Sequence, residues 1–116
     1  MTLEDLLKKI VEVDGSDLHI TVGTPPRVRK NGALIPMGDE KLMPDVVKSM
    51  VESKMNSEQL KRFNNGEEID YSIGIPGLSR FRVNVFSQRG NIAAAYRLMP
   101  SINSLIASYI KIKNYE

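Results

Sequence analysis

The chain has 116 residues, 41% of them hydrophobic, with 16 basic and 14 acidic side chains and a net charge of +2, as in one small soluble domain with a hydrophobic core. The absence of cysteine excludes disulfides and cysteine-based zinc sites, and a single histidine, His19, excludes a histidine-rich metal centre. No apolar run approaches the roughly 20 residues of a membrane-spanning helix, and the start of the chain is acidic, so we expect a cytoplasmic protein that does not span a membrane.

The first segment predicts a helix followed by a strand. Apolar residues recur at spacings of three and four over residues 3–13, which is typical of a helix with one buried stripe. Thr2 is a suitable N-cap for this helix, and the Asp-Gly-Ser break at residues 14–16 ends it. Residues 18–22 then alternate between apolar and polar, which indicates a strand with one buried face.

A β-hairpin and two helices are expected next. Asn31-Gly32 supplies the positive φ angles of a two-residue type I′ turn between two short strands. Pro44 suits the first position of a helix with an apolar stripe that reaches towards Met55. Ser57 is the expected N-cap of a shorter helix over residues 58–64.

The second half of the chain changes to a period of two. This pattern predicts antiparallel strands at residues 69–75, 80–86 and 91–99, with Pro100 ending the last. A two-residue turn at Arg89-Gly90 joins the last two strands and fixes their register. One face of this pair is then apolar throughout, whereas a shift by one residue would bury charge beside the core. In the favoured register Arg82 faces Arg97, Asn84 faces Ala95, Phe81 faces Leu98, Val83 faces Tyr96 and Val85 faces Ala94.

The charge is unevenly distributed along the chain. Residues 1–70 carry ten basic and thirteen acidic side chains, whereas residues 71–115 carry six basic and no acidic ones. Two arginines directly opposite each other, Arg82 and Arg97, repel unless a carboxylate or phosphate lies between them. Guanidinium groups bind phosphate oxygens in pairs, so this face is the strongest candidate for an anion site. The alternative is an exposed arginine stripe that pairs with acids from the first 70 residues.

Other chemistry is weakly supported. The glycines form no Gly-x-x-x-x-Gly-Lys-Ser/Thr loop and no dinucleotide fingerprint. Asp17 and His19 share one face of a strand, but such residues near a strand end more often bond to the backbone of a turn than act in catalysis. RNA binding is a further alternative. The few aromatic residues argue against it and leave Phe86 as the possible stacking residue, so we expect no nucleic-acid partner.

Four segments of the sequence, in order along the chain, carry a resemblance to a known family. The segments are Gly-Ser-Asp-Leu-His-Ile at 15–20, Gly-Thr-Pro-Pro-Arg-Val-Arg at 23–29, Arg-Phe-Arg-Val-Asn-Val-Phe at 80–86 and Tyr-Arg-Leu-Met-Pro at 96–100. Together they resemble the amino-terminal domain of PilT-type pilus retraction (twitching motility) ATPases, in the type II/type IV secretion ATPase superfamily. The likeness runs from Leu3 to about Leu105 and is specific because all four occur in the same order.

The resemblance implies a PAS-like domain of the α/β (α+β) class over residues 1–105, with an antiparallel-rich sheet of about six strands packed by helices. In the family this domain precedes a RecA-like ATPase domain, the subunits form a hexamer, and the amino-terminal domain packs on the ATPase domain of a neighbouring subunit. Its arginines approach the ATP held there. The residues that match are Arg82 and Arg97 first, then Arg80 and Asn84. Their implied role is to stabilise phosphate charge and to couple the nucleotide state to rotation of the domain.

The resemblance also has limits. The chain contains no Walker A lysine, Walker B acid or histidine motif, so we expect no catalysis by this chain alone; it would need no cofactor of its own, and the full-length protein would use ATP and magnesium. Residues 106–113 alternate like a strand, unlike the linker of the family. Residues 106–116 are therefore an atypical tail: a truncated linker, a non-native sequence, or a strand that pairs with another copy.

The function expected from the resemblance is that of a regulatory and oligomerisation domain in a hexameric type IV pilus retraction ATPase. Such a protein would be cytoplasmic, peripheral at the inner-membrane pilus machinery, and in contact with the pilus base. Two alternatives stay open: the same domain of a pilus-assembly or type II secretion ATPase, and a freestanding PAS-like module that binds a small anion.

Overall fold

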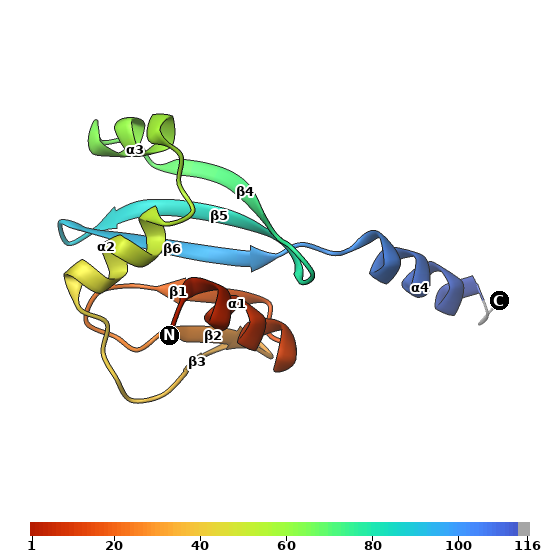
Figure 1. Cartoon of the computed structure of the whole chain (residues 1–116). Coiled ribbons are helices and arrows are strands. Elements are labelled where there is room, and N and C mark those ends of the chain that lie inside the picture. Colours follow the sequence, from red (N-terminus) through yellow and green to blue (C-terminus); the bar gives the residue numbers. More distant parts are fainter. Residues whose placement is uncertain (114–116) are drawn as a thin grey trace.

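The computed structural model describes residues 1–113, without the side chains of residues 102–104 and 108. Within this range the chain forms one antiparallel sheet of six strands and four helices (Figure 1). This confirms the expected α+β class with helices packed on an antiparallel sheet. The elements are α1 (Leu3–Glu12), β1 (Asp17–Ile20), β2 (Arg27–Lys30), β3 (Ala33–Pro36), α2 (Pro44–Glu52), α3 (Ser57–Asn64), β4 (Ile69–Ile75), β5 (Ser79–Gln88), β6 (Asn91–Leu98) and α4 (Ile102–Lys113).

The sheet joins the two halves of the sequence at its centre. Its strand order is β3-β2-β1-β6-β5-β4, and every neighbouring pair is antiparallel. The β2–β3 hairpin therefore extends one side of β1, and the meander of β4, β5 and β6 lies on the other side. The first strand after α1 pairs with the last strand of the sheet, a long-range pairing that the hairpin patterns alone do not specify.

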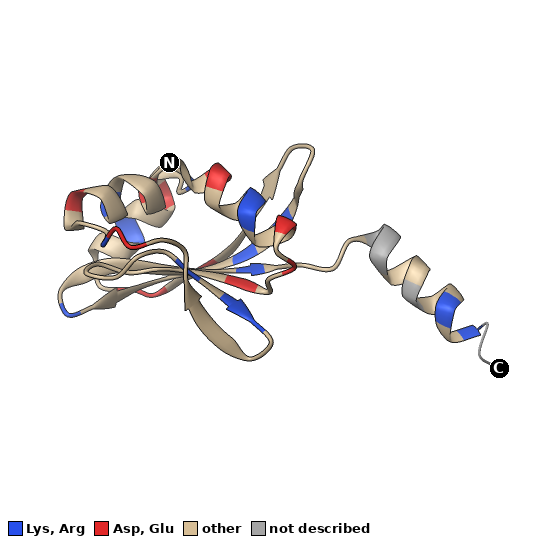
Figure 2. Ribbon diagram, turned by 90° about the horizontal axis from the view of Figure 1, so that it is seen from below, with Lys and Arg blue, Asp and Glu red and all other residues tan. Residues whose placement is uncertain are grey.

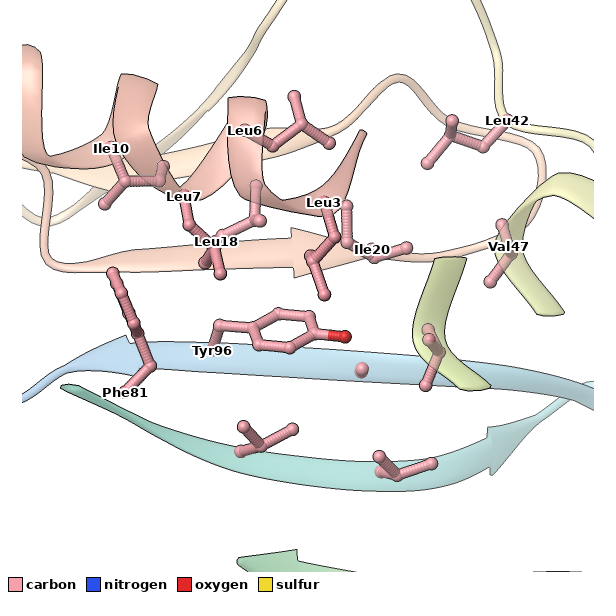
Figure 3. Close-up of a cluster of buried hydrophobic side chains, with 14 of the residues drawn as sticks. Leu3, Leu6, Leu7, Ile10, Leu18, Ile20, Leu42, Val47, Phe81 and Tyr96 are labelled. Atoms are coloured by element: carbon pink, nitrogen blue, oxygen red, sulfur yellow. The ribbon is translucent and has the colours of Figure 1, made fainter. Parts of the chain in front are cut away.

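The hydrophobic core lies between one face of this sheet and the helices α1 and α2 (Figure 3). Alternate residues of the central strands point into it, because successive side chains of a strand lie on opposite faces. Tyr96 and Phe81 are the largest fully buried side chains of this core. The helices contribute Leu3, Leu6, Leu7, Ile10, Val47 and Val51, and the sheet contributes Leu18, Ile20, Val28, Ile69, Phe81, Val83, Val85, Ala94 and Tyr96.

Both predicted two-residue turns are confirmed. Asn31 and Gly32 have φ angles of 52° and 80°, and Arg89 and Gly90 have φ angles of 52° and 79°. The second turn places Gln88 opposite Asn91, and the pairing continues to Arg82 opposite Arg97 and Phe81 opposite Leu98. The apolar face of this hairpin is thus in the core, as its register predicts.

Helix α1 begins as expected, whereas α3 begins one residue earlier than predicted. The Thr2 side chain accepts a hydrogen bond from the Asp5 backbone, and Asp5 accepts one in return, forming a capping box. At α3 the prediction of Ser57 as N-cap is wrong, because Asn56 caps the helix instead. Asn56 and Gln59 exchange the same reciprocal bonds, at 2.8 and 2.9 Å.

The strand expected at residues 106–113 is wrong, since this segment belongs to helix α4. Leu105, Ile106, Tyr109 and Ile110 follow the three- and four-residue spacing of one helical stripe, which a reading of alternate residues overlooks. The helix extends away from the sheet (Figure 1), and these four side chains are exposed. Among the described residues, no helix combines the length and hydropathy needed to cross a bilayer.

Gly15 provides a test of the packing between α1 and the β2–β3 hairpin. A methyl group at this position would overlap Cγ2 of Val28, which is buried. We expect Gly15→Ala to lower the free energy of unfolding by about 1–3 kcal/mol, as overpacking typically does. Urea denaturation measures this, with Lys8→Ala on the exposed side of α1 as a control expected to stay within about 0.5 kcal/mol. Equal stability of Gly15→Ala and the parent chain would contradict the packing described.

Tyr96 provides a test of the buried polar atoms. Its hydroxyl and that of Tyr71 are buried and have no hydrogen-bond partner among the described residues, and burial raises the pKa of Tyr71 to about 12. Removing an unpaired buried hydroxyl relieves its desolvation cost, so we expect Tyr96→Phe to raise the free energy of unfolding by about 1 kcal/mol. Thermal or urea unfolding checks this, with Tyr109→Phe at an exposed position as the control. A loss of stability in Tyr96→Phe would show that the hydroxyl has a partner.

Candidate functional site

Charged residues lie next to one another on neighbouring strands of the sheet (Figure 2). In this row Asp17 of β1 is paired on one side with Arg29 of β2 and on the other with Arg97 of β6. Arg97 is paired in turn with Arg82 of β5. We call these four residues the arginine row. The two-residue period of the strands places the arginine row on the face of the sheet opposite α1 and α2, because at least one sequence neighbour of each member packs in the core. These neighbours are Leu18, Val28, Phe81, Val83 and Tyr96.

Asp17 is the carboxylate at the centre of the arginine row. Its side chain is only 6% exposed. Ser16 Oγ donates a hydrogen bond to Oδ2 at 2.7 Å, and Arg97 Nε donates one to Oδ1 at 2.9 Å. Arg29 Nε lies 3.9 Å from Oδ2, which is a longer and weaker ion pair. Each oxygen of this carboxylate therefore has its own donor.

These contacts keep Asp17 ionised. Burial favours the neutral acid, but the hydrogen bonds from Ser16 and Arg97 together outweigh burial, so the pKa of Asp17 lies below its ordinary value. His19 follows on the same face, opposite Arg27. Its pKa is lowered first by burial and then by the positive charge of Arg29, so the imidazole is neutral at neutral pH.

Arg82 and Arg97 are directly opposite each other, as predicted, but they are not equivalent. Arg97 is bound to Asp17 through Nε, and its side chain is 72% exposed. Arg82 is exposed and has no ion-pair or hydrogen-bond partner among the residues that the structure describes. Arg97 therefore has a counter-charge within the domain, whereas Arg82 has none among the described residues. The alternative, pairing with acids from the first 70 residues, describes Arg97 but not Arg82.

The structure places the two secondary candidates differently. Arg80 lies two residues before Arg82 on the same strand face, where its Nη2 donates to Ser72 Oγ at 2.9 Å. Asn84 Nδ2 donates to Glu68 Oε1 at 2.7 Å and to Asp70 Oδ1 at 3.2 Å. Asn84 thus adjoins two carboxylates, whose charge disfavours a phosphate there. Of the four candidate residues, the three arginines lie together in a basic region and Asn84 borders an acidic one.

The sequence singled out Asp17 and His19 as a weak catalytic pair and did not assign Asp17 to Arg97. In the structure Asp17 is committed to Ser16 and Arg97, and among the described residues no hydrogen bond joins it to His19. The signal that could have found this contact is the pairing of β1 with β6, which brings together residues 80 positions apart in the chain. Asp17 is therefore the counter-charge of the arginine row.

The lowered pKa of Asp17 predicts an acid-dependent loss of stability. Its folded pKa is below the ordinary value of about 3.9, so its contribution is complete above that pH and is lost as the pH falls through the folded pKa. We expect the difference in free energy of unfolding between the parent chain and Asp17→Asn to shrink as the pH falls from 5 to about 2. Urea titrations at several pH values measure this difference. A constant difference would contradict the ion pair.

The comparisons with known proteins find relatives among pilus ATPases. The type IV pilus ATPase PilU of Pseudomonas aeruginosa is 37% identical over 97 residues, which are 84% of this chain and 25% of the relative. The type IV pilus retraction ATPase PilT of the same organism is 35% identical over 101 residues, 87% of this chain and 29% of the relative. No protein-family model matches the chain.

The solved structures that resemble this chain are also ATPases. The crystal structure of the pilus retraction motor PilT with bound ADP matches with a TM-score of 0.81 and 34% identity, over 87% of this chain and 30% of that one. The ATPase DotB of Legionella pneumophila matches in fold, with a TM-score of 0.73 and 21% identity over 86% of this chain and 30% of DotB. The chain thus spans between a quarter and a third of the length of the relatives it matches. By sequence and by fold, the chain corresponds to the amino-terminal domain of type IV pilus ATPases such as PilU and PilT.

Proposed function

We propose that this domain supplies arginine side chains to an ATP site in a pilus retraction motor and transmits the nucleotide state as a rotation of the domain. The observation that carries the proposal is the placement of Arg82 and Arg97 opposite each other on a face that α1 and α2 leave uncovered. Relatives that are ATPases, one of them solved with bound ADP, support it. Retraction is favoured over assembly or type II secretion because a retraction motor is among these relatives.

The charge balance of the arginine row fits a phosphate ligand. The row holds three arginines, Arg29, Arg97 and Arg82, and one carboxylate, that of Asp17, so it carries an excess of positive charge. Arginine keeps its charge at any relevant pH and presents a planar fork that matches phosphate oxygens. A phosphate between Arg82 and Arg97 would offset the repulsion of two like charges on neighbouring strands.

The partners of this function lie outside the chain. The proposed partner is a RecA-like ATPase domain, from the same and from a neighbouring subunit of a hexamer, and the motor would act at the pilus base on the cytoplasmic side of the inner membrane. ATP and magnesium would be held by that ATPase domain. The arginine row would add positive charge to the phosphates from outside the catalytic domain, so Arg82 and Arg97 rank first, Arg80 second and Asn84 last.

Removing either arginine tests this proposal. We expect Arg82→Ala and Arg97→Ala each to weaken binding of ATP by at least about tenfold, because a hydrogen bond to a charged group contributes about 1.5–3 kcal/mol. Binding is measured with the chain and a separately produced ATPase domain of a PilT relative, at two salt concentrations. Arg89→Asn in the β5–β6 turn is the matched control, because it removes the same charge away from the arginine row. Equal affinity in all four proteins would contradict the proposal.

The same titration separates the motor domain from a freestanding module. Binding of the chain to the ATPase domain that strengthens with ATP supports the motor domain. Saturable binding of ATP or triphosphate without any association with the ATPase domain would instead support a freestanding anion-binding module. The arginine variants report on both outcomes, since both use the same face of the sheet.

A further inference from the structure

We infer that Asp17 is a positioning residue for Arg97, which it holds through Nε so that the terminal nitrogens of the guanidinium face a phosphate shared with Arg82. This inference rests on the proposed function and adds a residue to its site. The proposed site contains only groups that would touch the phosphate. Asp17 would not touch the phosphate itself and would act by orienting the side chain of Arg97.

The carboxylate of Asp17 is itself fixed in place. Its side chain is 6% exposed, and its two oxygens have different donors, Ser16 Oγ on Oδ2 and Arg97 Nε on Oδ1. The backbone of the preceding residue, Ser16, is also held by both neighbouring strands, because Ser16 N donates to Arg29 O at 2.9 Å and Leu98 N donates to Ser16 O at 3.0 Å. The anchor of Arg97 therefore lies on a rigid part of the sheet.

The contact leaves the far end of Arg97 available. Asp17 binds Nε, the nitrogen nearest the backbone, while the Arg97 side chain stays 72% exposed. A long side chain loses up to about 2 kcal/mol of conformational entropy when it is immobilised. Because Asp17 already restrains Arg97 in the folded domain, part of this loss precedes phosphate binding. Arg82 has no such anchor among the described residues.

The charge of Asp17 acts in the opposite direction. A carboxylate next to Arg97 repels an incoming phosphate, so simple removal of Asp17 mixes a loss of orientation with a gain in electrostatic attraction. Two neutral substitutions separate these effects. Asp17→Asn and Asp17→Ala remove the same charge, but only asparagine keeps an oxygen that accepts the hydrogen bond from Arg97 Nε.

The experiment compares these two variants with tripolyphosphate as the probe. We expect Asp17→Asn to bind tripolyphosphate at least threefold more tightly than Asp17→Ala, whatever the affinity of the parent chain. Nitrogen-detected NMR of the arginine side chains gives a second readout that needs no ligand. The Arg97 Nε–H should exchange slowly with solvent in the parent chain and in Asp17→Asn, and rapidly in Asp17→Ala. The backbone amide spectrum establishes that each variant is folded.

A third variant tests whether the effect depends on the guanidinium group of Arg97 and not only on its charge. Arg97→Lys keeps the positive charge but cannot be held at one nitrogen while presenting two others, so we expect it to bind tripolyphosphate as weakly as Asp17→Ala or more weakly. Arg29→Gln, which removes the weaker partner of Asp17, should leave the exchange of Arg97 Nε–H slow. Fast exchange in Arg29→Gln would overturn the assignment of Asp17 as the anchor.

The outcomes distinguish the two proposals. If Arg82→Ala and Arg97→Ala leave the binding of ATP in the presence of the ATPase domain unchanged, the proposed function fails and the positioning role fails with it. If those variants lose binding while Asp17→Asn and Asp17→Ala bind equally, only the positioning role of Asp17 is overturned. Tighter binding by Asp17→Asn together with slow Arg97 Nε–H exchange supports both.

Discussion

The two-residue period of the central strands is the constraint on which the rest of the structure depends. In β1, β5 and β6, each residue that packs in the core is followed by one on the opposite face. The same strand register therefore determines both which residues form the core and where the arginine row lies. A slip of one residue between β5 and β6 would bring Arg97 among the side chains that surround Phe81 and expose Tyr96. The cost of burying that charge therefore also fixes where the arginines lie.

The arginine row shows how a counter-charge can be distant in sequence and adjacent in space. The last acid before residue 116 is Asp70, so residues 71–115 contain no carboxylate to balance their arginines. Asp17 supplies one from the start of the chain, across the pairing of β1 with β6. This single carboxylate lowers the repulsion between Arg97 and Arg82 without neutralising both, which leaves Arg82 as the more available cation among the described residues.

Local patterns predicted the elements that local physics determines. The turns at Asn31-Gly32 and Arg89-Gly90 depend on residues that accept positive φ, and the register of the last hairpin follows from one turn and one apolar face. Contacts between distant segments could not be predicted from local sequence patterns, because the order of the strands depends on the packing of the whole sheet. The Asp17–Arg97 contact belongs to that class. The two local errors, the cap of α3 and the tail, arose where two patterns competed: adjacent Asn56 and Ser57 both suit a cap, and alternating isoleucines also fit a helical stripe.

Gly15 links the packing of the core to the position of the arginine row. It lacks a side chain because Val28 occupies that space, and it stands two positions before Asp17 on a backbone held between β2 and β6. A bulkier residue there would press on Val28 and displace the start of β1, and the carboxylate of Asp17 would move with it. The orientation of Arg97 is thus set partly by an uncharged contact on the far side of the sheet, and a substitution of Gly15 would alter a charged site that it never touches.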